Sequence, residues 1–349
     1  MTPLRRILVR CPNWVGDVVM ATPAIRALRL AHPEARIDLA IKRYAAPVLA
    51  GWSRIDGIVE LGPELGRGMR RVLRTARLYR AGDYDAILLL TNSLGTALEA
   101  RLAGIPRRVG YAGEGRSPLL TERLPRGPKT RFGYREPEPM VDFYLRAAER
   151  LGARADDLRY ELEARPEDEA FARAWLERHD LGDRPLIGLN PGAKFGSSKL
   201  WSPERFAAAA DALVHETGGV AVVLGGPGEE PLLADIAGRM KERVVDSGRD
   251  LVPLGPLKAL LPHLALLVTT DTGTRAMAQA LGVPTVVVMG ATHPGWTARN
   301  LERSRVLIHD VPCGPCHLKT CPQPTHRCMD LISVPEVIAA ARGLLARSD

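Results

Sequence analysis

Long apolar runs are missing from this sequence. The longest stretch without Asp, Glu, Lys or Arg, residues 276–298, contains glycines, prolines and Gln279. It therefore predicts a helix, a strand and a loop, and it does not fit a membrane span. Arg10 and Asp17 interrupt the apolar residues near the start, so a secretory signal peptide is not expected either. We expect a cytoplasmic protein.

Two common nucleotide-binding signatures are also missing. No Gly-Lys-Ser or Gly-Lys-Thr occurs anywhere, which excludes a Walker A loop. No G-x-G-x-x-G follows the first predicted strand, which argues against a standard dinucleotide-dependent oxidoreductase. Two large classes of nucleotide-dependent enzyme are therefore not expected.

Cysteines are few, but four of the five lie in one segment, "CGPCHLKTCPQPTHRC". The spacing C-x2-C-x4-C-x6-C could supply zinc ligands, with His317 and His326 as substitutes. It differs from the paired C-x2-C knuckles of a zinc ribbon, and disulfides are not expected in a cytosolic chain. Structural zinc and four reduced thiols both stay open, whereas a catalytic metal is not expected. The residues concerned are Cys313, Cys316, Cys321 and Cys328.

The first half of the chain alternates short apolar runs with amphipathic stretches. Strands are predicted at residues 6–9, 36–41, 58–61, 86–90 and 108–110. Helices are predicted at residues 24–31, 45–52, 69–80, 96–103 and 140–151. This alternation indicates a parallel sheet covered by helices on both faces. Residues 113–138 are rich in Gly, Pro and Arg and predict a long loop.

The second half repeats the scheme. Strands are predicted in "PLIGLNPG", "VAVVLGG", residues 265–268 and "PTVVVMG", and helices at residues 203–216, 229–239, 274–281 and 335–346. Because 349 residues exceed what one core usually organises, we expect two doubly wound α/β domains, residues 1–165 and 166–349. Ligands of such sheets bind beyond the carboxyl ends of the strands, so two facing domains would form a cleft.

Basic residues are concentrated in the first half. The net charge is +8, and residues 65–135 contain 15 Lys and Arg against 5 Asp and Glu. Six arginines there recur at helical spacing, which is typical of a solvated helix face. An anionic partner, such as phosphate, a lipid headgroup or nucleic acid, is the alternative interpretation. These arginines are Arg67, Arg70, Arg71, Arg74, Arg77 and Arg80.

Three strand-to-helix junctions carry polar and small residues. They are "PNWVGD" near residue 15, "NPGAKFGSSKLW" at residues 190–201 and "TTDTGTRAMAQALG" at residues 269–282. The second and third of these loops, each next to a helix N-terminus, suit phosphate because their backbone N–H groups are free to donate. An ordinary connecting loop with exposed lysines, and a simple helix cap at Asp271, are the alternatives.

Taken together, these junctions resemble one protein family. "ILVRCPNWVGDVVMATPAIRALRLAHPEARID", "NPGAKFGSSKLWSPERFAAAADAL" and "TTDTGTRAMAQALGVPTVVVMGATHPGWT" are similar to the ADP-heptose:lipopolysaccharide heptosyltransferases of glycosyltransferase family nine. "TNSLGTALEARLAGIPRRVGY" and the "CGPC" segment resemble its heptosyltransferase II group. The resemblance implies a GT-B fold of two Rossmann-like domains, with acceptor on the first and nucleotide sugar on the second. It implies an inverting transfer of heptose to the lipopolysaccharide inner core that needs no cofactor.

The resemblance also assigns residues. Asp17 matches the family's general base, with Asn13, Gly16 and Asn92 on the acceptor side. On the donor side, Lys199 matches a lysine that contacts the diphosphate, with Lys194 as the other lysine of that loop. Asp271, Thr272 and Gly273 match an element at the nucleotide sugar, and Glu229 matches an acidic residue near the ribose. The implied partners are ADP-heptose, an anionic core acceptor and, peripherally, the cytoplasmic face of the membrane, but not nucleic acid.

One position departs from the family pattern. The family has His in Asp-x-Gly-x-x-His, where this chain has Ala276, preceded by Arg275. Arg275 could supply the missing donor to the diphosphate, or the chain could use a different donor or acceptor. A GT-B-like sugar-nucleotide epimerase and a basic, zinc-bearing nucleic-acid binder are the alternatives outside the transferases.

Asp17 itself has two interpretations. It follows the first strand next to Gly16, where it could act as the base that removes a proton from a sugar hydroxyl. It could instead cap a helix. A helix that begins at Thr22-Pro23 would not need Asp17 as its cap, whereas a helix that begins at Gly16 would be kinked by Pro23.

Overall fold

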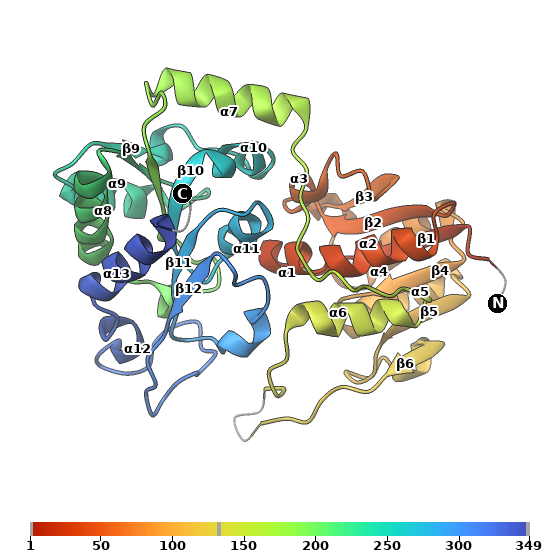
Figure 1. The fold of residues 1–349 in the computed structure, drawn as a ribbon. Helices are drawn as coiled ribbons and strands as arrows, with labels where there is room; N and C mark the ends of the chain where they lie inside the picture. Colours follow the sequence, from red (N-terminus) through yellow and green to blue (C-terminus); the bar gives the residue numbers. More distant parts are fainter. Residues whose placement is uncertain (1–2, 131–133, 347–349) are drawn as a thin grey trace. The chain divides into compact units, whose positions relative to one another are not determined.

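The computed structural model describes residues 3–130 and 134–346. The chain divides into two units, Met1–Glu163 and Ala164–Asp349, each described below by itself. Every strand predicted in the first half is present in unit 1, which contains a six-stranded parallel sheet (Figure 1). Its strands are β1 (Arg6–Arg10), β2 (Arg36–Lys42), β3 (Gly57–Leu61), β4 (Ala86–Leu89), β5 (Arg107–Tyr111) and β6 (Glu122–Leu124).

Helices cover both faces of this sheet. On one face, α4 (Gly68–Ala81) packs along α5 (Leu94–Ala103), and both bury apolar side chains against the strands. The other face carries α1 (Val15–Met20), α2 (Thr22–Ala31) and α6 (Met140–Glu149), and α3 (Ala46–Leu49) lies next to α1. The sequence predicts a helix over residues 45–52, but the observed helix, α3, is only four residues long.

The long loop predicted at residues 113–138 is interrupted by the edge strand β6. That prediction was wrong for β6 because its three residues, Glu-Arg-Leu, are too few to show an alternating apolar pattern. Residues 131–133 of the predicted loop lie outside the described residues.

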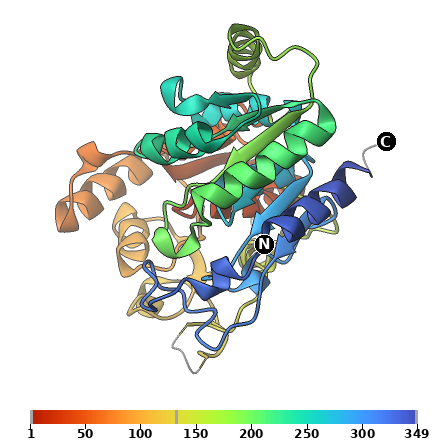
Figure 2. The ribbon, with the colours of Figure 1, turned by 90° about the vertical axis from the view of Figure 1, so that its left-hand side faces the viewer.

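Unit 2 contains a second six-stranded parallel sheet. Its strands are β7 (Leu186–Asn190), β8 (Val220–Val223), β9 (Val244–Asp246), β10 (Leu264–Thr270), β11 (Thr285–Val288) and β12 (Ser304–Leu307). Its helices are α7 (Pro166–Arg178), α8 (Pro203–Thr217), α9 (Glu230–Arg239), α10 (Leu254–Leu260), α11 (Gly273–Ala280), α12 (Arg327–Asp330) and α13 (Val334–Leu345). Helix α13 packs beside α8 on one face (Figure 2), and the core there is centred on Trp201 and Phe206, whose rings meet edge to face.

Both sheets have the same topology, so the prediction of two doubly wound domains is confirmed. The strand order is β3-β2-β1-β4-β5-β6 in unit 1 and β12-β11-β10-β7-β8-β9 in unit 2. In each sheet the order reverses between two central neighbours, β1 and β4 in the first and β7 and β10 in the second. Ligands of open α/β sheets bind at the carboxyl ends of such strands. No described helix is long and apolar enough to cross a membrane.

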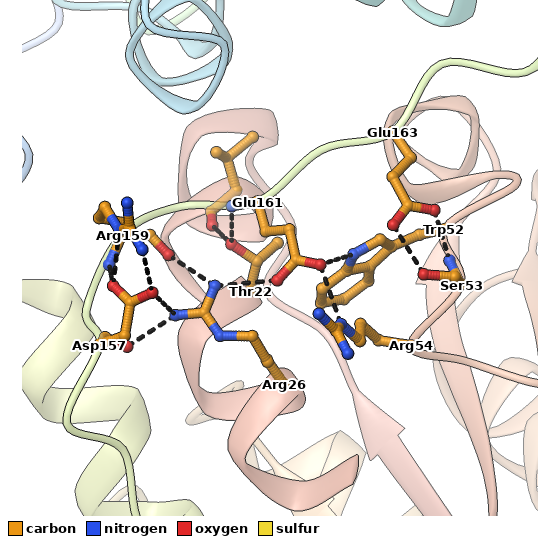
Figure 3. Close-up of polar contacts among 10 residues, drawn as sticks. Thr22, Arg26, Trp52, Ser53, Arg54, Asp157, Arg159, Glu161 and Glu163 are labelled. Atoms are coloured by element: carbon orange, nitrogen blue, oxygen red, sulfur yellow. Dashed lines mark hydrogen bonds and ion pairs between the residues drawn. The ribbon is translucent and has the colours of Figure 1, made fainter. Parts of the chain in front are cut away.

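The segment that leads from α6 to the end of unit 1 is fastened to α2 (Figure 3). Arg26 on α2 donates hydrogen bonds to the carbonyl oxygens of Asp157 and Arg159 and to the carboxylate of Glu161, at 2.7, 3.1 and 2.9 Å. The backbone N–H of Glu161 donates to the hydroxyl of Thr22 at 3.0 Å. One side of this segment is thereby held by a largely buried guanidinium.

The same segment is also attached beside α3 (Figure 3). Glu161 accepts hydrogen bonds from the indole of Trp52 at 3.2 Å and the guanidinium of Arg54 at 2.9 Å. Glu163 accepts from the backbone and the hydroxyl of Ser53, at 2.8 and 2.6 Å. The chain is thus held to unit 1 up to its last residue.

Candidate active site

Asp17 lies just beyond the carboxyl end of β1. Two short helices follow that strand, α1 and α2, separated by Ala21. The helix start predicted at Thr22-Pro23 is confirmed by α2, whereas α1 ends before Pro23, so no helix from Gly16 is kinked by that proline. Pro23 is accommodated in the first turn of α2, where its missing N–H costs nothing. Trp14 is the N-cap residue of α1, and Asp17 lies inside the first turn, where a carboxylate is favoured by the helix dipole. Asp17 is therefore not the cap of α1.

A tyrosine from α6 holds the Asp17 carboxylate. The hydroxyl of Tyr144, a residue that is 2% exposed, donates a hydrogen bond of 2.8 Å to Asp17 Oδ1. Burial, followed by the charge of Asp17, raises the pKa of Tyr144 well above its ordinary value of 10, so the phenol stays a donor. Tyr144 was missed from the sequence because it belongs to no motif and lies 127 positions away.

The other residues predicted beside Asp17 also follow β1 and β4. Gly16 is the second residue of α1. Asn13 accepts a hydrogen bond of 3.0 Å from Arg10, and its carbonyl oxygen accepts one from the hydroxyl of Tyr44. Asn92 lies past the end of β4, and its buried Oδ1 has no hydrogen-bond partner among the described residues. Gly16, Asn13 and Asn92 thus lie at the edge of the unit 1 sheet that is formed by the carboxyl ends of β1 and β4.

In unit 2, the second and third predicted junctions meet at one charged cluster. Lys199 Nζ lies 2.7 Å from Asp271 Oδ2 and also donates to the Asp271 carbonyl oxygen at 3.0 Å. Lys199 follows β7 and Asp271 follows β10, so the pair lies where the strand order of this sheet reverses. The side chains of Lys199 and Asp271 are only 12% and 13% exposed, which strengthens their attraction.

Two further side chains complete the cluster around Asp271. Arg275 is 2% exposed and donates to Asp271 Oδ1 at 2.9 Å, and Thr292 donates to Oδ2 at 2.8 Å. Burial by itself would raise the pKa of Asp271, but the charges of Lys199 and Arg275, with these hydrogen bonds, hold it at about 2. Two cations and one carboxylate leave a net positive charge, which suits an anionic ligand.

The N-terminus of α11 lies beside this cluster. Thr272 is the N-cap residue and Gly273 the first residue of α11. The Thr272 hydroxyl donates to Asn190 Oδ1 at 2.9 Å, and Asn190 in turn donates to the Leu224 carbonyl oxygen at 2.9 Å. Asn190 thereby fixes the start of α11 to the ends of β7 and β8. The amides of this first turn add donors for an anion.

Glu229 and Lys194 differ in how closely they approach the loop that carries Lys199. The carboxylate of Glu229 packs directly against Gly192 of that loop: a Cβ atom on Gly192 would lie only 2.2 Å from Glu229 Oε1. The Glu229 carboxylate also accepts a hydrogen bond of 2.9 Å from the Gly226 N–H. Lys194 is exposed, whereas Lys199 points inward to Asp271. Of the two lysines, Lys199 is the one that the fold brings to the cluster.

The structure does not support structural zinc, one of the two interpretations left open for the cysteine segment. The four cysteines line one cavity of about 20 Å³, but within residues 3–130 and 134–346 no group of three or more His, Cys, Asp and Glu side chains is placed to hold a metal ion. Burial, and then the neighbouring thiols, raise the pKa of Cys328 to about 11, so this thiol is protonated in the metal-free chain. These cysteines are free thiols in the structure.

The sequence and the structure are both similar to those of known proteins. The family model described as "Glycosyltransferase family 9 (heptosyltransferase)" matches residues 72–326 of the sequence. Lipooligosaccharide heptosyltransferase 2 of Haemophilus influenzae is 29% identical over 86% of this chain and 88% of its own length. The structure of a family 9 glycosyl transferase from Veillonella parvula is similar with a TM-score of 0.85 and 26% identity, over 98% of both chains. The structure of E. coli ADP-heptose LPS heptosyltransferase II gives 0.79 and 25%, over 98% of this chain and 99% of that one.

Proposed function

This chain belongs to glycosyltransferase family 9, the heptosyltransferases, and on that premise we propose that it transfers heptose from ADP-heptose to the lipopolysaccharide inner core. The positive cluster of Lys199, Asp271 and Arg275 beside the α11 N-terminus is the observation that carries this proposal. The cluster provides fixed cations, and the first turn of α11 provides backbone N–H donors; both lie at the carboxyl ends of central strands and can bind a diphosphate. The related proteins do not favour an epimerase or a nucleic-acid binder.

In the proposed reaction, Asp17 takes the proton of the acceptor hydroxyl as the hydroxyl oxygen bonds to the anomeric carbon. The bond between that carbon and the ADP phosphate oxygen breaks, and ADP leaves with the electron pair. Attack opposite the leaving group inverts the anomeric configuration. Lys199 and the first-turn amides of α11 stabilise the charge that develops on the diphosphate. Asp271 holds Lys199 and Arg275 in place.

Incubation with ADP-heptose and a heptose-deficient core acceptor tests the proposal, with products measured by mass spectrometry. We expect the acceptor to gain one heptose, and we expect ADP, but not UDP or an oligonucleotide, to raise the melting temperature. Stabilisation by UDP in place of ADP would point to a different donor. No sugar transfer despite ADP binding would point to a different acceptor.

Lys199→Ala is expected to weaken ADP binding by about 1–3 kcal/mol, because it removes a charge-assisted hydrogen bond to the diphosphate. Isothermal titration calorimetry measures this, with the melting temperature as a check on folding. Lys194→Ala is the matched control, since it removes the same charge from the same loop at an exposed position. Unchanged affinity in Lys199→Ala with a loss in Lys194→Ala would assign the phosphate contact to Lys194.

The outer face of α4 is the proposed contact for the anionic acceptor and the lipid surface that carries it. Arg67, Arg70 and Arg77 are exposed there, and no hydrogen bond or ion pair links their side chains to another residue within 3–130 and 134–346. Met69, Leu73 and Leu78, on the same helix, are 58%, 46% and 41% exposed. Exposed leucines among unpaired arginines are typical of a surface that meets anionic lipid.

Two measurements test this assignment. Raising the salt concentration should increase the acceptor KM more than the donor KM, because salt screens exposed charges. The double variant Arg70→Gln/Arg77→Gln should bind anionic phospholipid vesicles more weakly by about 1 kcal/mol for each arginine. Arg173→Gln/Arg249→Gln is the matched control, since it removes two exposed charges from unit 2. Equal losses in both double variants would exclude a specific role for α4.

A further inference from the structure

The cysteine segment, residues 313–328, crosses the loops that follow β7 and β11. The backbone N–H of His317 donates to the Ala291 carbonyl oxygen at 2.8 Å. The N–H of Ser198, next to Lys199, donates to the Lys319 carbonyl oxygen at 3.0 Å, and the Ser198 hydroxyl donates to that of Leu318. Three consecutive residues are therefore fixed between the loop that carries Lys199 and the loop that carries Thr292.

The cysteine segment also packs closely against the loop that carries Lys199. A Cβ on Gly196 would lie 2.2 Å from the Lys319 carbonyl oxygen, so only glycine fits at this crossing. The ring of His326 lies 2.8 Å from the Ser198 carbonyl oxygen. The cysteine segment thus sets the position of the loop on which Lys199 depends.

The ring of His317 lies beside the charged cluster. It packs on Trp296, with ring centroids 4.4 Å apart. The residue after Trp296, Thr297, accepts a hydrogen bond from Arg275 of the cluster through its carbonyl oxygen, at 3.5 Å. His317 also has a φ of 55°, in the left-handed region that a non-glycine residue adopts only where its surroundings enforce it.

The family motif has a histidine where this chain has Ala276, so the nearby His317 is a candidate to replace it. Ala276 is buried inside α11 and carries no donor, and Arg275 is directed to Asp271. No histidine therefore reaches the cluster from α11, whereas His317, in the cysteine segment, is bound to the loop that carries Thr292 and packs on Trp296. We propose that His317 donates a ring N–H to a phosphate oxygen of the donor's diphosphate, in place of the histidine that α11 lacks. This inference rests on the proposed function.

Binding of ADP and of adenosine to His317→Gly, measured by calorimetry, tests the inference. Glycine removes the ring and accepts the left-handed backbone without strain. We expect ADP affinity to fall about tenfold, as for a lost hydrogen bond to a charged group, and adenosine affinity to change less than twofold. His317→Asn, which tolerates the same backbone and retains an N–H donor, should recover part of the loss. His309→Ala, whose ring pairs with Glu336, is the control and should leave both affinities unchanged.

Equal losses for ADP and adenosine in His317→Gly would overturn the inference, because they would indicate that the ring only supports the fold of the loop. Unchanged ADP affinity would overturn it as well. If the parent protein itself fails to bind ADP, the proposed function fails first. ADP binding by the parent with no effect of His317→Gly would reject the role of His317 alone.

Discussion

Asp17→Asn is expected to lower turnover at least 10²-fold while ADP binding and stability stay close to those of the parent. The amide has almost the same shape as the carboxylate and can still accept the Tyr144 hydrogen bond, but it cannot take a proton from the acceptor hydroxyl. Single-turnover transfer of heptose, followed by mass spectrometry, measures the chemical step. A rate near that of the parent would remove Asp17 from the role of base.

Tyr144→Phe is the companion variant, because it leaves the carboxylate in place and removes only the hydroxyl that orients it. We expect a smaller loss in kcat than for Asp17→Asn and a shift in the pH dependence of kcat, since hydrogen bonding to a carboxylate alters its pKa. A loss in Tyr144→Phe as large as in Asp17→Asn, with no shift in the pH profile, would indicate that the tyrosine supports the fold of this region.

Asp271→Ala is expected to destabilise the protein by about 3–5 kcal/mol, because it leaves the buried cations Lys199 and Arg275 without their shared carboxylate. Urea unfolding measures the loss. Asp271→Asn is the matched control, since it keeps the hydrogen bond from Thr292 but not the charge, and it should fall between the parent and the alanine variant. Equal stabilities for all three proteins would show that the cluster contributes nothing to folding.

The same carboxylate predicts a dependence on pH. The pKa of Asp271 is lowered from 3.8 to about 2 in the folded chain, so its stabilisation is fully present above 3.8 and is lost as the pH falls towards 2. The shift corresponds to about 2 kcal/mol. The difference in unfolding free energy between the parent and Asp271→Asn should therefore shrink over this range of pH.

The central strands could be predicted because each is a short apolar run next to a helical pattern. β1, β2 and β4 begin where expected, and the repeat of the scheme in the second half predicts the second sheet. The edge strands β6 and β9 have three residues each, too few for periodicity to register. Helix α10 was also missed, since its sequence LGPLKAL carries a glycine and a proline in the first turn.

The candidate site was predictable only in part, for a different reason. Sequence motifs indicated Asp17, Lys199 and Asp271, because each follows a strand and matches a family pattern. Their supporting partners follow no pattern, since Tyr144 and His317 come from segments that reach the strand ends only in the folded chain. Parallel sheets join residues far apart in sequence, and no local rule identifies the side chain that arrives from elsewhere.

Interdomain linkers are usually the segments where insertions accumulate and where proteases cut. Here Glu161 and Glu163 are hydrogen-bonded to residues of α2 and of the loop after α3, and Arg165 pairs with Asp168 in the first turn of α7 at 3.0 Å, so Ala164 is the one residue between these contacts. A fragment of unit 1 cut after Leu151 would leave Arg26 and Trp52 without these partners, whereas one cut after Glu163 would keep them. A cut at Ala164 therefore leaves the contacts on both sides of it intact.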